Sequence, residues 1–185
     1  MPAWVNLANL LTLLRLFLVP VVVYEIVAGR FWAAGWLFGG AAFTDILDGL
    51  AARGMSETTP FGAYLDPIAD KCLLSGVYLA LAWVHLVPWW LVALIFGRDI
   101  YILAAVGLFI LLTPVRRFPP SIWGKVSTFV QIMTAVTCFA AAVFGTRVLA
   151  QMAAAMLWPC AAFTVWSGLA YTWKGIRIIK ISTAP

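Results

Sequence analysis

Four aspartates occupy one stretch of the sequence as two pairs with helical spacing. Asp45 and Asp48 are three residues apart, and Asp66 and Asp70 are four residues apart. On an α-helix either spacing puts both carboxylates on the same side. The connection between the pairs is short and contains Pro60, so we expect two antiparallel neighbouring helices whose four carboxylates converge.

Four converging carboxylates predict a divalent metal site. Like charges in one pocket repel, and desolvation strengthens the repulsion. Hard cations relieve it because they prefer carboxylate oxygens. Four aspartates suffice for two Mg²⁺ or Mn²⁺ ions about 3.5–4 Å apart, the arrangement that stabilises in-line phosphoryl displacement. Gly49, Ala52 and Gly62 are small residues beside the aspartates, which lets a ligand approach the backbone closely.

The segments that must position these aspartates are strongly hydrophobic. Of 185 residues, 64% are hydrophobic and 10% are charged, whereas soluble domains carry about 25% charged residues. This composition excludes a soluble enzyme, a disordered tail and a nucleic-acid-binding domain, despite the net charge of +5. Crossing a bilayer takes roughly 20 apolar residues, and six such stretches use nearly the whole chain. We therefore expect an all-α polytopic membrane protein, a single integral membrane catalytic domain over 1–185, with transmembrane helices at 7–27, 31–51, 65–84, 89–112, 126–144 and 148–173.

The distribution of basic residues orients the expected bundle. Seven of the 12 Lys and Arg residues fall in the even-numbered connections and the C-terminal tail, and two fall on the opposite side. The positive-inside rule then places both termini and the aspartate cluster in the cytoplasm. The first span has no basic residues ahead of it and no small-residue cleavage site, so we do not expect a cleaved signal peptide.

The aspartate pattern resembles the signature of the CDP-alcohol phosphotransferase family. The pattern D-x2-D-G-x2-A-R-x8-G-x3-D-x3-D runs from Asp45 to Asp70, with eight specified residues in 26 positions. The segment from Asn9 to Arg15, followed by Pro20, is similar to the N-terminal segment of the family's phospholipid-synthesising members. The resemblance implies a six-helix enzyme of a bacterial-type inner or plasma membrane. It would transfer a phosphatidyl group from CDP-diacylglycerol to an alcohol and release CMP.

The resemblance also implies roles for individual residues. Asp70 would be the general base that deprotonates the acceptor hydroxyl, and Arg53 would contact the diphosphate. A homodimer is implied as well, and Gly35, Gly39 and Gly40 could provide close helix contacts. The implied metal ligands are Asp45, Asp48, Asp66 and Asp70, and the implied CDP-binding residues are Asp48, Gly49, Ala52, Arg53, Gly62 and Asp66.

A second group of charges predicts an acceptor that itself carries a phosphate. Adjacent helix residues point about 100° apart, so we expect Asp99 to be a poor partner for Arg98. The Arg98 guanidinium would instead clamp a phosphate in bidentate fashion. A mutually compensating pair is the alternative. Lys125 lies in a segment similar to the glycine-lysine segment of phosphatidylglycerol-phosphate and cardiolipin synthases. The candidate acceptor residues are Arg98, Asp99, Arg116, Arg117 and Lys125, although Arg116 and Arg117 could simply set the topology.

The residues after Arg98 predict which acceptor the enzyme uses. Family members that use glycerol phosphate typically have a further Arg eight residues later, where this chain has Val106. The stretch 98–106 resembles CMP-forming cardiolipin synthases instead, so we expect phosphatidylglycerol as the acceptor, with glycerol 3-phosphate as the alternative. A cation- or proton-coupled transporter could use the same aspartates, but it needs access from both sides of the membrane. Glu25 has no assigned role, and the three cysteines are expected to be small hydrophobic fillers.

Overall fold

The computed structural model contains six α-helices in the part of the chain that it describes, residues 7–51, 60–112 and 122–182. Side chains are described there except at 7–11, 45–51, 60–68, 106, 108–112 and 174–182. The helices are α1 (Leu7–Val27), α2 (Phe31–Ala51), α3 (Pro60–Trp83), α4 (Trp89–Leu112), α5 (Ile122–Phe144) and α6 (Arg147–Ser182).

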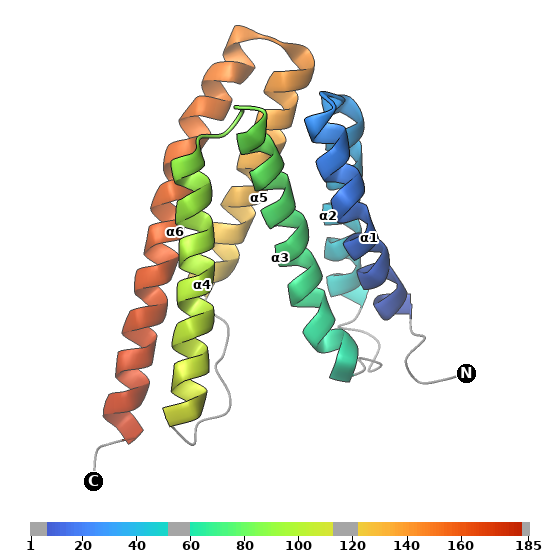
Figure 1. Cartoon of the computed structure of the whole chain (residues 1–185). Coiled ribbons are helices and arrows are strands. Elements are labelled where there is room, and N and C mark those ends of the chain that lie inside the picture. The colour runs from blue at the N-terminus through green and yellow to red at the C-terminus, as the bar shows by residue number, and fades with distance from the viewer. Residues whose placement is uncertain (1–6, 52–59, 113–121, 183–185) are drawn as a thin grey trace.

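The helices run alternately up and down (Figure 1). The beginnings of α1, α3 and α5 therefore lie at the same end of the bundle as the ends of α2, α4 and α6. We call this the aspartate end, because Asp45 and Asp48 lie in the last turns of α2 and Asp66 lies near the beginning of α3. The alternation agrees with the grouping of connections that the basic residues predicted.

Three of the six predicted helices match the structure to the residue, namely α1, α2 and α4. The helix α3 begins at Pro60, five residues earlier than expected. Proline suits the first position of a helix because its missing N–H has no intrahelical partner there. The helix α6 continues to Ser182, nine residues beyond the predicted span. A helix satisfies its own backbone hydrogen bonds, so it need not end where an apolar stretch ends.

Where side chains are described, α3 packs along α1 rather than along α2. There α1 packs against both α2 and α3, while α2 also contacts α5, and α3 also contacts α4 and α5. Contact between α2 and α3 is absent among the residues with described side chains, and the helix ends that carry Asp45, Asp48 and Asp66, where the pairing is expected, lie outside that set. A short connection brings two helix ends together but does not require their whole lengths to pack.

Turns at the opposite end of the bundle use a left-handed residue after the helix. Gly29 has a φ of 74°, and the Arg30 amide donates to the Glu25 carbonyl oxygen at 2.9 Å. His85 has a φ of 61° after α3, and Gly145 has a φ of 62° after α5. Glycine is the usual residue at such a position, because it has no Cβ atom to clash. The first turn also explains Glu25, whose carboxylate forms an ion pair with Arg30 at 2.6 Å.

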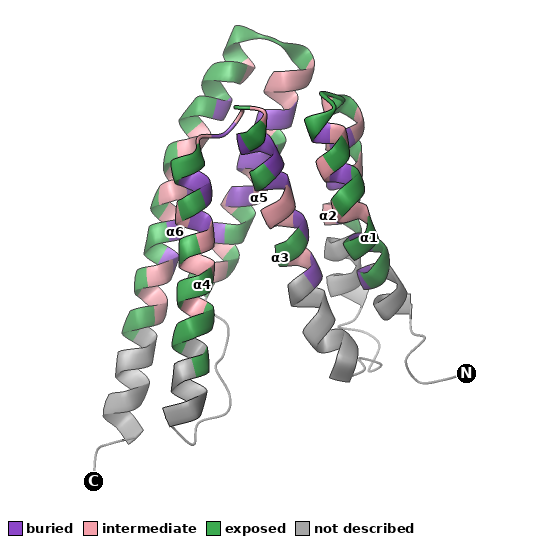
Figure 2. Ribbon diagram, viewed as in Figure 1, coloured by how far each residue is buried: buried purple, intermediate pink, exposed green. Residues whose placement is uncertain are grey.

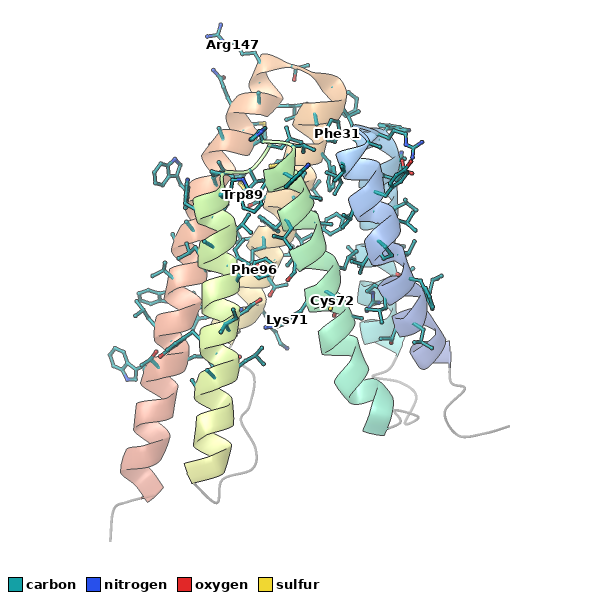
Figure 3. All side chains as sticks on the ribbon, in the orientation of Figure 1. Phe31, Lys71, Cys72, Trp89, Phe96 and Arg147 are labelled. Carbon is teal, nitrogen blue, oxygen red and sulfur yellow. The ribbon has the colours of Figure 1, made fainter. Side chains whose placement is uncertain are left out.

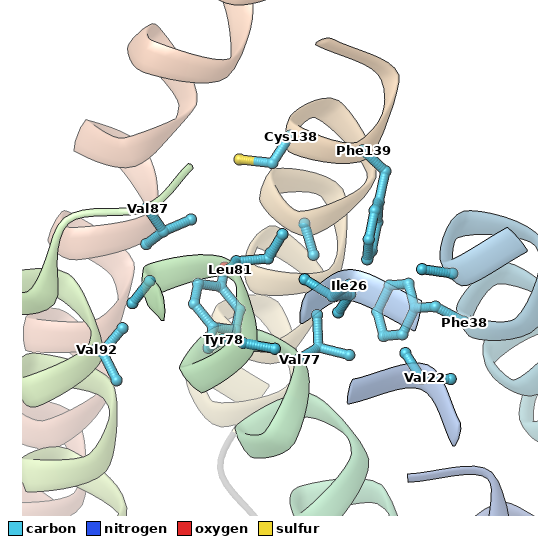
Figure 4. Packing of buried hydrophobic residues seen from close by; sticks show 14 of the residues in the cluster. Val22, Ile26, Phe38, Val77, Tyr78, Leu81, Val87, Val92, Cys138 and Phe139 are labelled. Carbon is cyan, nitrogen blue, oxygen red and sulfur yellow. The ribbon is translucent and has the colours of Figure 1, made fainter. Parts of the chain in front are cut away.

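The described core lies nearer to this opposite end than to the aspartate end. It is built from side chains such as Ile26, Phe38, Val77, Leu81 and Phe139, contributed by α1, α2, α3 and α5 (Figure 4). The outer faces of the helices carry many exposed residues (Figure 2), and large apolar side chains such as Phe17 and Trp158 are among them. Exposed apolar surface on this scale marks an interaction with lipid or protein. Where side chains are described, Ile122–Phe144 and Arg147–Trp173 are long and apolar enough to cross a membrane.

A buried polar network joins α3 to α5 and α6. The Tyr78 hydroxyl donates to the Gln131 carbonyl oxygen at 2.9 Å and lies 3.5 Å from the Cys160 sulfur. The Gln131 side-chain amide donates to the Thr164 hydroxyl at 3.2 Å. Buried polar groups are costly unless they are paired, so this network favours one relative placement of the three helices. Cys138 and Cys160 are buried, as expected of small fillers, whereas Cys72 is exposed.

Gly76 lets α1 and α3 approach each other closely. A Cβ atom at this position would lie 3.1 Å from Val19 Cγ1 and 3.2 Å from Val23 Cγ2. We expect Gly76→Leu to lower the stability of the protein by about 1–3 kcal/mol, because overpacking forces side chains and backbone apart. Thermal unfolding in detergent measures the change. Gly40→Leu is the matched control, because a Cβ atom at Gly40 meets nothing within 4 Å. Equal melting temperatures for the two variants would contradict the expectation.

Candidate active site

The carboxylate of Asp70 is bound by a buried arginine from another helix. Arg15 of α1 donates from Nη1 to Asp70 Oδ1 at 2.6 Å. The Arg15 side chain is 4% exposed, whereas the Asp70 side chain is 40% exposed. The arginine is therefore part of the interior, while the carboxylate lies partly at the surface.

The sequence of α1 explains why Arg15 reaches Asp70. Arg15, Val19 and Val23 follow one another at four-residue intervals, so they lie along one face of α1. Val19 and Val23 pack close to Gly76 of α3. The same face therefore brings Arg15 to α3 nearer to the aspartate end, where Asp70 lies. A buried guanidinium without a partner is strongly destabilising, so this helix contact and the ion pair depend on each other.

The next residue of α3, Lys71, points toward a different helix. Its Nζ lies 3.2 Å from Oδ1 of Asp99 on α4, and Figure 3 shows the side chain extending from α3 into the space beside α4. Adjacent helix residues diverge by about 100°, so Asp70 and Lys71 make contacts on two sides of α3. These contacts link α1, α3 and α4 at one level of the bundle.

Arg98 and Asp99 form an ion pair, contrary to the expectation from their spacing. Arg98 Nη1 lies 2.6 Å from Asp99 Oδ1. The Cβ atoms of the two residues point in different directions. The arginine side chain is long enough to bend toward Asp99 and bridge that difference. Arg98 also donates from Nη2 to the Ser167 hydroxyl of α6. The mutually compensating pair is therefore present, and in this arrangement two of the guanidinium nitrogens have protein partners.

Two glycines make room for Arg98 between α5 and α6. A Cβ atom at Gly124 would lie 3.4 Å from Arg98 Nη2 and 3.4 Å from the Tyr171 ring. A Cβ atom at Gly168 would lie 3.8 Å from Arg98 Cγ. Lys125 follows Gly124 directly and is exposed. Cationic side chains from α3 and α4, Lys71 and Arg98, therefore contact Asp99.

The remaining predicted site residues are placed only by their helices or not at all. Asp45, Asp48 and Gly49 lie in the last turns of α2, and Gly62 and Asp66 lie near the beginning of α3, all at the aspartate end. Their side chains are outside the described set. Ala52, Arg53, Arg116 and Arg117 lie outside the described residues altogether. Among the described side chains, no three His, Cys, Asp or Glu residues lie close enough together to bind a metal ion. Three of the four predicted ligands, Asp45, Asp48 and Asp66, are not among the described side chains.

Sequence reasoning missed Arg15, Lys71 and Ser167 as parts of this region. Arg15 was visible as a charge inside an apolar span, and such residues are rare and mark functional positions. Lys71 was visible as the neighbour of Asp70. Ser167 carries no such signal, because small polar residues are common wherever apolar helices pack together.

The comparison with protein families identifies the class. Residues 5–166 match the family model described as CDP-alcohol phosphatidyltransferase. The match covers most of the chain and includes all four aspartates as well as the Arg98–Asp99 pair. The protein therefore belongs to the CDP-alcohol phosphatidyltransferase family, a family of membrane-integral transferases.

Curated relatives are named either as phosphatidylglycerophosphate synthases (glycerol-3-phosphate phosphatidyltransferases) or as cardiolipin synthases. A probable phosphatidylglycerophosphate synthase of Mycobacterium tuberculosis is 39% identical over 94% of this chain and 83% of its own length. A cardiolipin synthase (CMP-forming) of Rattus norvegicus is 34% identical over 95% of this chain and 64% of its own length. A CDP-diacylglycerol–glycerol-3-phosphate 3-phosphatidyltransferase of Bacillus subtilis is 31% identical over 96% of this chain and 98% of its own length.

Replacing Arg15 tests whether the ion pair positions Asp70. We expect Arg15→Leu to lower kcat at least ~10-fold, because it would displace Asp70, the predicted general base, and a small displacement of such a group has large kinetic effects. Arg15→Lys, which keeps the charge, should recover part of the loss. The measurement is CMP release by purified protein, with Asp70→Asn setting the floor.

The control for this experiment is Arg30→Leu. Arg30 also pairs with a carboxylate, that of Glu25, but it lies at the opposite end of the bundle. Its replacement should leave kcat unchanged. Normal kcat in Arg15→Leu would show that Asp70 needs no support from α1.

Proposed function

We propose that this protein is a polytopic membrane enzyme that transfers the phosphatidyl group of CDP-diacylglycerol to phosphatidylglycerol, producing cardiolipin and CMP. The observation that carries the proposal is that consecutive residues of α3 make two ion pairs, Asp70 with Arg15 of α1 and Lys71 with Asp99 of α4. Lys71 follows Asp70, and its Nζ lies 3.2 Å from Asp99, which in turn pairs with Arg98. The acceptor's phosphate would bind at these cations, and the acceptor's hydroxyl would lie near Asp70.

In the proposed reaction, Asp70 is the proton acceptor and CMP is the leaving group. Asp70 accepts the proton of the acceptor hydroxyl, and the resulting oxygen forms a new bond to the β-phosphorus of CDP-diacylglycerol. The bond from that phosphorus to the CMP oxygen breaks, and CMP leaves with the electron pair. Arg15 holds one Asp70 oxygen at 2.6 Å.

The donor set fits divalent cations, which we propose as cofactors. Asp45, Asp48, Asp66 and Asp70 are all carboxylates, and their helix positions put them at the same end of the bundle. Two Mg²⁺ or Mn²⁺ ions bound by these residues would neutralise charge on the phosphates and on departing CMP. Gly49, Ala52 and Gly62 would line the cytidine pocket, and Arg53 would contact the diphosphate.

The residue at position 106 favours phosphatidylglycerol as the acceptor. Val106 stands where the glycerol-phosphate-using members typically have a second phosphate-binding Arg, and an apolar residue there suits a lipid acceptor. The relatives named as phosphatidylglycerophosphate synthases favour glycerol 3-phosphate as the second candidate acceptor.

Removing divalent cations tests the proposed cofactors. We expect EDTA to abolish CMP release, because four carboxylates without counter-ions repel each other and the phosphates of the substrate. Added Mg²⁺ or Mn²⁺ should restore the activity. Full turnover in excess chelator would refute the metal requirement.

An acceptor panel tests the proposed reaction. Purified protein in detergent is supplied with CDP-diacylglycerol, a divalent cation and either phosphatidylglycerol or glycerol 3-phosphate. We expect cardiolipin from phosphatidylglycerol, identified by mass spectrometry, with CMP released in equal amount. Serine and inositol serve as phosphate-free controls and should yield no product. Product formed only from glycerol 3-phosphate would reverse the assignment of the acceptor.

A further inference from the structure

The guanidinium group of Arg98 is held by residues of two helices. Its Nη1 donates to Asp99 Oδ1 at 2.6 Å within α4, and its Nη2 donates to the Ser167 hydroxyl of α6. The Arg98 side chain is 10% exposed, and Ser167 is fully buried. A guanidinium is planar and its nitrogens are fixed relative to one another. Hydrogen bonds at two nitrogens therefore set the orientation of the whole group.

Of these two partners, Ser167 is the one that fixes Arg98 relative to another helix. Asp99 is the next residue along α4, so it moves together with Arg98. Ser167 instead draws the guanidinium across to α6, into the space beside Gly168 of α6 and Gly124 of α5. The hydroxyl of Ser167 thus determines where the charge of Arg98 lies in the bundle.

Ser167 lies on a stretch of α6 that is anchored on both sides. One turn earlier, the buried Thr164 hydroxyl accepts a hydrogen bond from the Gln131 side chain of α5 at 3.2 Å. Further along α6, the Thr172 hydroxyl lies 2.7 Å from the Tyr101 hydroxyl of α4. The position of the Ser167 hydroxyl is therefore set by contacts that do not involve Arg98.

Ser167 holds Arg98 without neutralising it. A serine hydroxyl is a neutral acceptor, so it adds no negative charge that would repel an anion. Nε of Arg98 is buried and has no hydrogen-bond partner among the described residues. A buried donor without a partner is costly, and guanidinium groups typically bind phosphate through two N–H groups. An arginine that is oriented but not fully paired suits an anionic ligand.

We propose that Ser167 is a positioning residue, which orients Arg98 for binding the phosphate of the acceptor. This inference rests on the proposed function, because it assumes that this phosphate binds at Arg98. The family match covers residues 5–166 and ends just before Ser167, so the match assigns no role to this serine.

Steady-state kinetics of Ser167→Ala test the proposal in the full-length protein. CMP release is measured in detergent while phosphatidylglycerol and CDP-diacylglycerol are varied in turn. We expect KM for phosphatidylglycerol to rise on the order of tenfold, because Arg98 loses a hydrogen bond that involves a charged group. The kcat value and KM for CDP-diacylglycerol should stay within about twofold, because loss of a contact made equally in ground and transition states raises only the KM of that substrate.

Two further substitutions of Ser167 separate hydrogen bonding from packing. Ser167→Thr keeps the hydroxyl and should recover most of the acceptor affinity. Ser167→Cys keeps a similar volume but offers only a weak acceptor, so it should resemble Ser167→Ala. Thr172→Ala is the matched control, because it removes another α6 hydroxyl that contacts α4, at Tyr101 rather than Arg98. Its kinetic constants should equal those of the wild type.

The double variant Arg98→Gln with Ser167→Ala shows whether the serine acts through the arginine. Arg98→Gln alone should raise KM for phosphatidylglycerol, and the added Ser167→Ala should raise it little further, because residues that share one interaction are not additive. A full additional increase overturns the proposal. If Arg98→Gln has no turnover, weaker acceptor binding in Ser167→Ala and Ser167→Cys than in Ser167→Thr supports the proposal, and equal KM values in all three overturn it.

A merely structural role for Ser167 gives different results. Equal increases of both KM values in Ser167→Ala overturn the proposal, and so does an equal effect of Thr172→Ala. A wild-type KM for phosphatidylglycerol in Ser167→Ala also overturns it. If Ser167→Ala does not fold, Ser167→Cys takes its place, because its side chain fills a similar volume.

The acceptor panel and this experiment fail separately. If the wild type makes product only from glycerol 3-phosphate, the proposed acceptor is wrong. The same variants assayed with glycerol 3-phosphate still test Ser167, because that acceptor also carries a phosphate. Conversely, cardiolipin synthesis by the wild type, together with an unchanged acceptor KM in Ser167→Ala, supports the proposed function and refutes the role of Ser167.

Discussion

The arrangement of this protein depends on the compensation of charge in a hydrophobic chain. An isolated charge in apolar surroundings is costly, so it must find a partner. The adjacent residues Asp70 and Lys71 find theirs on different helices, Arg15 of α1 and Asp99 of α4. Asp99 extends the linkage to Arg98, which reaches Ser167 of α6. One turn of α3 is therefore tied to three other helices.

The two ends of the bundle are stabilised in different ways. Away from the aspartates, α1 and α3 pack closely because Gly76 has no side chain, and apolar residues around Val77 fill the space between helices. Tyr78 and Gln131 add directional hydrogen bonds between α3 and α5. Because the apolar packing lies away from the aspartates, the aspartate end can carry carboxylates and cations that would not pack into a core.

The charged residues also connect the two substrates in the proposed reaction. Asp70 belongs to the signature that the family resemblance assigns to the CDP-linked substrate, and Lys71 belongs with the residues proposed for the acceptor. Because they are consecutive, a movement of this turn changes both sites together. The Arg15 ion pair restrains such movement on one side, and the contact of Lys71 with Asp99 restrains it on the other.

Much of this protein was predictable from local patterns. Apolar stretches of membrane-spanning length predicted the helices, and three of them to the residue, because helix formation in apolar sequence depends on neighbours along the chain. The family resemblance came from residue types and spacings between Asp45 and Asp70. The helix contacts were harder to predict: α1 rather than α2 packs along α3, since a short connection limits only the ends of two helices.

Residue identity and spacing determined the class of this protein and the chemistry available to it. Only the tertiary structure decided which charges meet. Arg15 and Asp70 are 55 residues apart, and no local pattern pairs them. Arg98 and Asp99 are adjacent, yet the helix geometry of Cβ atoms pointed to the wrong conclusion, because a long flexible side chain can fold back to its neighbour. Partners for charges are chosen by three-dimensional proximity and burial, which depend on how all the helices pack.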